Sequence, residues 1–230
     1  IDGVHDLQGM LSAITEKTKI LFVCNPNNPT GTIVEKEQLL TFLAQVPEDI
    51  LIVLDEAYYE YATSDSYLQS LPQLKKYSNL VILRTFSKIY GIAALRVGYG
   101  IMNPTISTEL TKVKEVFNVN KLAQSAAILA LEDQEYMKKC VQKNFEGKQF
   151  LEKELTLLGY TFFPSEANFV MIHTKQRGDK AAEALLKHGI IVRAGTLLGY
   201  PYTIRVTISS NEDNTFFMNI FKQLSEKGEA

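Results

Sequence analysis

The sequence predicts an α/β fold: a mainly parallel sheet with helices on both faces, followed by a smaller C-terminal α+β subdomain. Three short apolar runs carry this prediction, at residues 19–24, 50–54 and 80–83. Nearly continuous apolar runs are typical of strands that are buried on both faces, as in parallel sheets. Helix-type segments separate the three runs, which is the alternation expected of an α/β domain. Beyond residue 158 the strands and helices alternate more sparsely, which favours a separate α+β unit.

The first third of the chain supplies the first strand and its loop. Residues 7–14 have apolar side chains at helical spacing, and they lead into the strand at 19–24. The loop at 25–32 contains two prolines and a glycine, which exclude regular structure there. An amphipathic helix is expected at 35–43.

The next two strands end in polar residues. The run 50–54 is followed at once by Asp55, Glu56, Ala57 and Tyr58. A helix is expected at 67–77, before the third strand at 80–83. That strand gives way to a segment rich in hydroxyls, which then reaches Lys88.

The rest of the chain predicts one more strand at 97–101 and a largely helical middle section. We expect helices at 104–116, at 121–131 (Ala/Leu-rich and therefore buried) and at 136–158, the last ended by Gly159. Further elements are expected as strands at 160–163, 168–173, 190–193 and 203–209, and as helices at 180–188 and 212–227. Ser209 and Glu212 have the spacing of a capping box for the last helix. The expected division is a large domain at 1–117, connecting helices at 118–158 and a small subdomain at 159–230.

The composition excludes several classes of function. The 230 residues are 46% hydrophobic and 22% charged with a net charge of −2, which is ordinary for a globular protein and gives no basic patch for nucleic acid. No apolar run is long enough to span a membrane. The three histidines have no metal-ligand spacing, so no metal site is expected. The two cysteines suit a reducing compartment such as the cytoplasm. The chain begins at Ile1 rather than at methionine, which hints at a processed or truncated piece.

The polar residues that follow the three strands should meet at one edge of the sheet. Ligands bind at the carboxyl ends of the strands in open α/β sheets, so Asn28, Asp55, Tyr58 and Lys88 are expected to converge there. A partly desolvated lysine amine can form a Schiff base with a carbonyl compound. Taken one by one, these residues have simpler interpretations: Lys88 as a solvated loop lysine, Asp55 as a helix N-cap and the Asn/Pro loop as a rigid turn.

Six segments in this order make the chain resemble a known family. They are Asn-Pro-Asn-Asn-Pro-Thr-Gly (25–31), Asp-Glu-Ala-Tyr (55–58), Thr-Phe-Ser-Lys (85–88) with Arg96, Glu-Ala-Asn-Phe-Val (166–170), Gly-Ile-Ile-Val-Arg (189–193) and Ile-Arg-Val-Thr-Ile (204–208). The chain resembles the fold-type-I pyridoxal-phosphate (PLP) aminotransferases of class I/II, and within them the histidinol-phosphate aminotransferases. The resemblance implies the PLP-dependent transferase fold.

The resemblance also implies roles for the residues at the sheet edge. Lys88 would hold PLP as a Schiff base and then act as the acid/base on the substrate. Asp55 would keep the pyridine nitrogen protonated, while Asn28 and Tyr58 would hydrogen-bond the phenolic oxygen of the ring. The remaining cofactor ligands would hold the phosphate: Thr85, Ser87 and Arg96.

The substrate would be bound from the C-terminal part of the chain. Arg205 would bind the carboxylate of glutamate in one half-reaction and the phosphate of histidinol phosphate in the other, with help from Arg193. Without the resemblance, Arg205 is only one residue on the polar face of an alternating strand. Asn168 would lie at the same pocket. The implied activity is transamination between histidinol phosphate and 2-oxoglutarate/glutamate, in histidine biosynthesis.

The resemblance leaves alternatives open. An aromatic amino-acid aminotransferase and a PLP-dependent amino-acid-phosphate decarboxylase share the cofactor residues, and a non-catalytic fragment of the same fold is a remote alternative. A nucleotide-binding module is disfavoured because no phosphate-loop motif is present. The family carries an N-terminal region ahead of the segment that aligns with Ile1, so this piece is expected to be weakly active. The full-length enzyme is expected to be a homodimer that acts on small molecules.

Overall fold

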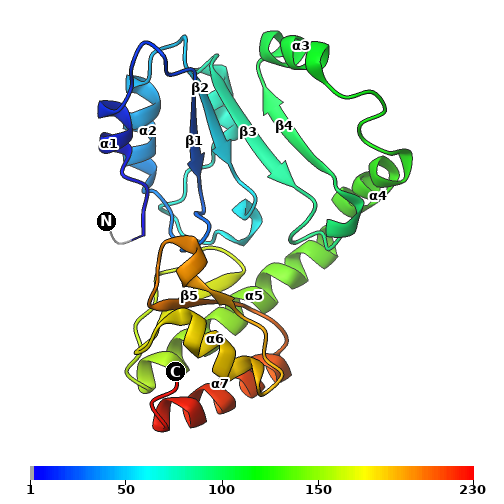
Figure 1. The fold of residues 1–230 in the computed structure, drawn as a ribbon. Helices are drawn as coiled ribbons and strands as arrows, with labels where there is room; N and C mark the ends of the chain where they lie inside the picture. The colour runs from blue at the N-terminus through cyan, green and yellow to red at the C-terminus, as the bar shows by residue number, and fades with distance from the viewer. Residues whose placement is uncertain (1–2) are drawn as a thin grey trace.

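The computed structural model describes residues 3–230 and has two lobes, each built on its own sheet (Figure 1). Sheet A forms the upper lobe in this view, and sheet B forms the lower lobe. The long helix α5 (Gln134–Leu157) runs from one lobe to the other. The α/β fold with a mainly parallel sheet and a smaller α+β unit is therefore confirmed.

Sheet A has four strands in the order β1-β2-β3-β4. The bounds are Ile20–Cys24 for β1, Leu51–Asp55 for β2, Leu80–Thr85 for β3 and Gly98–Met102 for β4. The first three strands are parallel, and β4 pairs antiparallel with β3. The carboxyl ends of β1, β2 and β3 consequently lie at one edge, which faces the sheet B lobe.

Helices α1 (Leu7–Ser12) and α2 (Lys36–Gln45) cover one face of sheet A. Alternate side chains of the strands, such as Leu54 and Ile82, pack there against Leu39 and Phe42, which are both 1% exposed. Burial of this apolar surface is what holds the helices to the sheet. The other face is less covered, since Phe22 on β1 remains 61% exposed.

Sheet B is antiparallel, with the order β5-β7-β6. Its strands are β5 (Phe169–His173), β6 (Arg193–Ala194) and β7 (Thr203–Thr207), and helices α6 (Gly178–Leu186) and α7 (Asn211–Glu226) pack on it with α5. Ile204 and Val206 point into this core, as the alternation in the sequence predicted.

Helices α3 (Pro104–Val113) and α4 (Lys121–Glu132) follow β4 and extend to the side of sheet A (Figure 1). A third apolar cluster lies where the two lobes meet α4 and α5, and it includes Tyr58, Phe86 and Phe169. Short 3₁₀ helices complete the chain: η1 (Tyr59–Tyr61), η2 (Leu71–Lys75), η3 (Ala93–Leu95) and η4 (Gly195–Leu198). Among residues 3–230, none of the helices is long and apolar enough to cross a membrane.

Several local predictions were wrong. The expected helix at 67–77 is only the 3₁₀ helix η2, with Pro72 in its first turn. Helix α4 is not buried: Ala123 and Ala127 are, but Leu122 is 79% exposed. The strand at 160–163 is reduced to a single bridge between Phe162 and Ile172, and the strand at 190–193 to the two residues of β6.

The cap of the last helix is shifted by one residue from the prediction. Ser210 is the N-cap, and its hydroxyl accepts a hydrogen bond from the Asp213 amide at 3.1 Å. Ser209 instead donates its hydroxyl to the Asp213 carboxylate at 2.7 Å. Ser210 and Asp213 form the capping box. Asp213, at the third helical position, takes the place of the expected glutamate and accepts from the Ser210 backbone amide. The glycine that ends α5 is confirmed, since Gly159 has a φ of +74°.

Candidate active site

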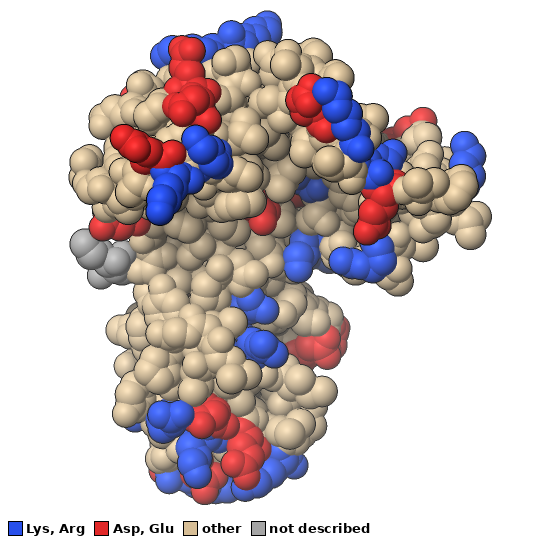
Figure 2. Space-filling view, turned by 45° about the horizontal axis from the view of Figure 1, so that its top comes forward, with Lys and Arg blue, Asp and Glu red and all other residues tan. Residues whose placement is uncertain are grey.

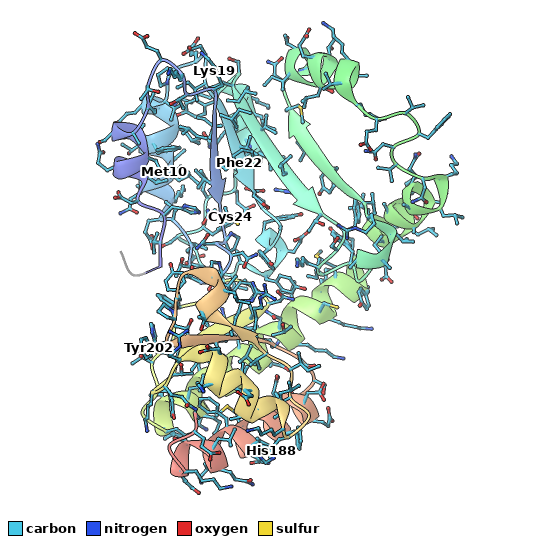
Figure 3. The ribbon with its side chains drawn as sticks, in the orientation of Figure 1. Met10, Lys19, Phe22, Cys24, His188 and Tyr202 are labelled. Carbon is cyan, nitrogen blue, oxygen red and sulfur yellow. The ribbon has the colours of Figure 1, made fainter. Side chains whose placement is uncertain are left out.

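The ends of the parallel strands bring the predicted residues together. The strand register pairs Asp55 of β2 with Cys24 of β1 on one side and with Leu83 of β3 on the other. Figure 3 shows Cys24 at the end of β1 that faces the sheet B lobe, so this edge opens toward the junction of the lobes. Figure 2 shows the notch between the lobes, with Lys and Arg side chains along its border.

A cavity of about 490 Å³ lies at this edge. It is lined by residues at and after the ends of β2 and β3. Five of the predicted site residues line it: Asp55, Thr85, Ser87, Lys88 and Arg96. The cavity therefore combines an amine, a carboxylate, two hydroxyls and a guanidinium.

Local hydrogen bonds arrange the polar groups of the cavity. The Thr85 hydroxyl accepts from the Ser87 amide at 3.1 Å, which turns the chain after β3. Asp55 Oδ1 accepts from the Ala57 amide at 3.1 Å, which is the bond of an Asx turn. Asp55 is not a helix N-cap, because the next helical element, η1, has Tyr58 in that position. Both contacts are local, and they leave one carboxylate oxygen of Asp55 without a protein hydrogen bond among the described residues.

Arg96 is held by its backbone and by one local bond. Its φ of +54° lies in the left-handed region, which is uncommon for a residue with a side chain. A guanidinium nitrogen donates to the Ala93 carbonyl at 2.8 Å. The side chain is exposed at the cavity mouth, so most of its hydrogen-bond donors remain available to an anion.

A series of aromatic contacts links Lys88 to the sheet B lobe. The Lys88 amine lies 5.2 Å from the ring centre of Tyr58, a residue only 4% exposed. Tyr58 packs edge-on against Phe169 at a centroid distance of 5.3 Å, and the guanidinium of Arg205 lies 4.8 Å from the Phe169 ring centre. These contacts set Arg205 of β7 on the same side of the junction as Lys88.

Arg205 also contacts the loop after β1, because its guanidinium donates to Asn28 Oδ1. On the neighbouring strand, Arg193 is its register partner. Like charges directly opposite each other on a sheet are destabilising, and neither arginine forms a salt bridge within the described chain. Two unneutralised guanidinium groups at one place favour the binding of an anion.

Asn168 is not among the residues that line the cavity. It precedes β5, and its backbone carbonyl accepts from the Ile208 amide at 2.9 Å, which ties it to the end of β7. The sequence reasoning also missed Phe169, whose ring joins Tyr58 to Arg205. Phe169 belongs to a nearly continuous apolar strand, so nothing in the sequence distinguished it from core residues.

Charge and burial around the cavity shift the pKa of a neighbouring group. Burial, with a further contribution from the Asp55 carboxylate, raises the pKa of the Cys24 thiol to about 11. The thiol is therefore protonated at neutral pH and is no nucleophile. Within residues 3–230, no cluster of three or more His, Cys, Asp and Glu side chains could hold a metal ion.

The groups that line the cavity fit PLP. An aldehyde can react with the Lys88 amine, a pyridinium nitrogen can pair with the Asp55 carboxylate, and a phosphate can accept from Thr85, Ser87 and Arg96. The carboxylate oxygen without a protein hydrogen bond is the atom that such a partner would satisfy. This match rests on the kinds of donor and acceptor that the cavity contains.

Comparison with known proteins identifies relatives over nearly the whole chain. Residues 2–219 match the family described as aminotransferase class I and II. Histidinol-phosphate aminotransferases are similar to the chain, including that of Geobacillus sp. (strain WCH70), with 48% identity over 97% of the chain, and that of Halalkalibacterium halodurans (strain C-125), with 50% identity over 93%. The chain spans only 61% and 58% of the lengths of these two relatives.

Solved structures of histidinol-phosphate aminotransferases have the same fold as this chain. The histidinol-phosphate aminotransferase of Sinorhizobium meliloti, solved in complex with pyridoxal-5'-phosphate, superposes with a TM-score of 0.86 and 30% identity, over 97% of this chain and 63% of that one. The enzyme of Clostridium acetobutylicum gives a TM-score of 0.89 and 27% identity, over 97% of this chain and 69% of that one.

Proposed function

Since the chain belongs to the class I and II aminotransferase family, we propose that it is the greater part of a PLP-dependent histidinol-phosphate aminotransferase. The observation that carries the proposal is the cavity lined jointly by Lys88, Asp55 and Arg96, groups that match the aldehyde, ring nitrogen and phosphate of PLP. The identity of 48–50% with enzymes of that name supports the same substrate class.

Each cavity residue would have a separate task. Bound PLP supplies an electron sink that stabilises negative charge on the substrate Cα. The Lys88 amine would bond the aldehyde carbon with loss of water, and once displaced by substrate it would carry the proton to and from Cα. Asp55 would keep the proton on the ring nitrogen, and Tyr58 and Asn28 would hydrogen-bond the phenolic oxygen.

The phosphate would be held at the end of β3. Thr85 and Ser87 offer hydroxyl donors, and Arg96 offers a planar fork that matches a phosphate. Holding the phosphate would fix the distance between the ring and the Lys88 amine, because the phosphate ligands and Lys88 belong to the same short segment, residues 85–96.

The two arginines of sheet B would recognise the anionic end of each substrate. Glutamate brings a carboxylate and histidinol phosphate brings a phosphate, and a guanidinium fork binds either. Arg205 contacts both Asn28 and Phe169, so it is oriented toward the sheet A side of the junction. Arg193 would assist at the phosphate, and Asn168 would lie at the wall of the pocket.

The test has two parts, and both use the full-length protein, which should match its relatives in length. Borohydride reduction with PLP should label the peptide that contains Lys88 and no other, and Lys88→Ala should abolish the label, while an exposed-lysine control, Lys112→Ala, should keep it. An assay with histidinol phosphate and 2-oxoglutarate should then show transamination. A label on another lysine would contradict the assignment of the amine. Turnover only of aromatic amino acids, or release of CO₂ from an amino-acid phosphate, would favour the alternatives with the same cofactor.

We expect the whole protein to act as a homodimer in the cytoplasm, where its two free cysteines, Cys24 and Cys140, would stay reduced. Domain limits at 1–117, 118–158 and 159–230 are part of the same proposal. Residues 1–230 expressed alone are expected to bind PLP more weakly than the longer protein and to turn over poorly. Equal affinity and turnover for the two proteins would show that the working site is complete within these residues.

A further inference from the structure

A buried ion pair lies at the cavity, since one of its members, Arg84, is among the residues that line it. Arg84 donates through two guanidinium nitrogens to Glu56 Oε2, at 3.0 Å and 2.9 Å. Glu56 is 2% exposed and Arg84 is 8% exposed. The Ser70 hydroxyl donates to the other oxygen of Glu56, and the Arg84 guanidinium lies 3.5 Å above the ring centre of Tyr59. The pair is therefore enclosed, and both carboxylate oxygens of Glu56 have hydrogen-bond partners.

Each of these residues is the chain neighbour of a proposed site residue. Glu56 follows Asp55, and Arg84 precedes Thr85. Because side chains alternate between the faces of a strand, Asp55 and Thr85 lie on the face opposite to Glu56 and Arg84. Arg84 lies on the same face of β3 as Ile82, two residues earlier, and Ile82 packs in the core between sheet A and α2. Tyr59, likewise, follows Tyr58.

The same network reaches the loop after β1. The Tyr67 hydroxyl, which also interacts with Glu56, donates to the Asn25 carbonyl at 2.9 Å. The Glu56 amide donates to the Leu83 carbonyl at 2.9 Å, which joins the end of β2 to that of β3. Glu56 thus joins the ends of β2 and β3 through its carboxylate and its amide, and Tyr67 extends the network to the loop after β1. The proposed cofactor ligands extend from these strand ends.

Stability alone does not explain a buried ion pair at this position. Desolvation of the two charges offsets much of their attraction, and replacement by well-packed apolar residues is often neutral or stabilising. Directional bonds, unlike apolar packing, fix the relative position of the elements that they join. Small displacements of groups that contact a reacting molecule are costly, about a hundredfold in rate for 1 Å.

We propose that Glu56 and Arg84 are positioning residues that fix the ends of β2 and β3, so that Asp55, Tyr58 and Thr85 are spaced to fit one cofactor. This inference rests on the proposed function, since the cofactor is the molecule that the spacing would fit. Neither residue touches the cofactor in this proposal: they act through their chain neighbours.

The experiment replaces the ion pair by apolar residues of similar size, Glu56→Leu with Arg84→Met, in the full-length protein. Glu56→Gln is made as a single variant. The matched control is Asn79→Leu, because Asn79 is 6% exposed and hydrogen-bonds the Pro47 and Ile50 carbonyls at the opposite, amino-terminal ends of the same strands. Three quantities are measured: the melting temperature without cofactor, the dissociation constant for PLP by absorbance titration, and the pH at which the absorbance of bound PLP changes.

We expect the double variant to melt close to the wild type, to bind PLP about tenfold more weakly and to shift the spectral pH midpoint. Asn79→Leu should lower the melting temperature but keep PLP affinity and the midpoint. If the double variant does not fold, Glu56→Gln takes its place, and its PLP affinity and spectral midpoint are compared with those of Asn79→Leu. Unchanged PLP affinity and midpoint in the variants of the pair, or equal losses in Asn79→Leu, would overturn the positioning role. A wild-type protein that does not bind PLP would instead overturn the proposed function and this inference with it.

Discussion

The two lobes differ in how completely they bury their sheets. Sheet B packs against α5, α6 and α7, and its strand side chains Ile172 and Ile204 are without exposed surface, as is Phe221 of α7. Sheet A is covered by α1 and α2 on one face, yet Ile20 and Phe22 on the first strand are 47% and 61% exposed. Large apolar side chains gathered on a strand face are normally a contact surface. The lobe that carries most of the proposed chemistry is thus the less enclosed one.

The lobes also contribute different kinds of group to the site. Sheet A supplies an amine, a carboxylate and hydroxyls at its parallel strand ends, whereas sheet B supplies two adjacent arginines that have no acidic partner within residues 3–230. The first set suits covalent and acid/base chemistry, and the second suits the recognition of an anion. The following predictions test whether chemistry and recognition are divided between the lobes in this way.

The largest effect is expected from Lys88→Ala in the sheet A lobe. Under the proposed function, loss of the amine would remove both the covalent bond to the cofactor and the acid/base group, and acid/base catalysis alone contributes about 10²–10⁴-fold. We expect kcat to fall by about 10³-fold or more, with little change in KM for the substrate that sheet B is proposed to bind. Steady-state kinetics of the full-length protein would measure both. A large rise in KM with retained kcat would show that the lobes do not divide the work in this way.

Arg205→Ala in the sheet B lobe should have the next largest effect. A charge-assisted bond contributes about 1.5–3 kcal/mol, so the glutamate and histidinol-phosphate half-reactions should both weaken by about ten- to a hundredfold. Arg205→Lys should restore part of the loss, since an ammonium cannot form the fork. Arg177, an exposed arginine of the same lobe that pairs with Asp179 at 3.2 Å, gives the control Arg177→Ala. An unimpaired glutamate half-reaction in Arg205→Ala would contradict the dual role.

The exposed face of sheet A predicts self-association of residues 1–230 when they are expressed alone. Burial of a half-exposed phenylalanine stabilises a contact by about 1.5 kcal/mol, so Phe22→Ser should weaken the association about tenfold. Phe216 on α7 is 51% exposed in the better covered lobe, and Phe216→Ser is the matched control. Sedimentation velocity over a concentration series measures both. If both substitutions weakened self-association equally, the exposed face of sheet A would not be the surface through which the molecules associate.

The sequence predicted most of what depends on periodicity. The apolar runs located β1, β2 and β3, and the geometry of a parallel sheet then required Asp55 and Lys88 to meet at one edge. The Glu56–Arg84 pair was not predicted, because a charged residue beside a strand end is usually solvated. The burial of α4 was wrongly predicted from its Ala/Leu content, since composition does not show which surface a helix meets. Phe169 and Arg205 meet through tertiary contacts between strands of opposite direction, for which the sequence has no local signal.

The smallest effect is expected at Glu60, in the short helix η1 that follows β2. Burial raises the pKa of its carboxyl to about 7, an effect that Glu56 reinforces and that Arg84 and Tyr90 oppose. One of its oxygens has no hydrogen-bond partner among the described residues. Above pH 4.5 the unfolded chain releases this proton while the folded protein keeps it, so the free energy of unfolding should decrease as pH rises from about 4.5 to about 7.

Glu60→Gln should remove this pH dependence and stabilise the protein at pH 8 by about 1 kcal/mol, less than the full shift implies because the carboxyl is not completely enclosed. Native-state hydrogen exchange can assign the effect to a lobe, since amides of β2 and β3 should gain protection at pH 8 while those of β5 and β7 should not. Glu115→Gln, at an exposed carboxylate, is the control. The same gain in both sheets would mean that the lobes unfold as one cooperative unit, and no gain in either would mean that Glu60 ionises without cost to the fold.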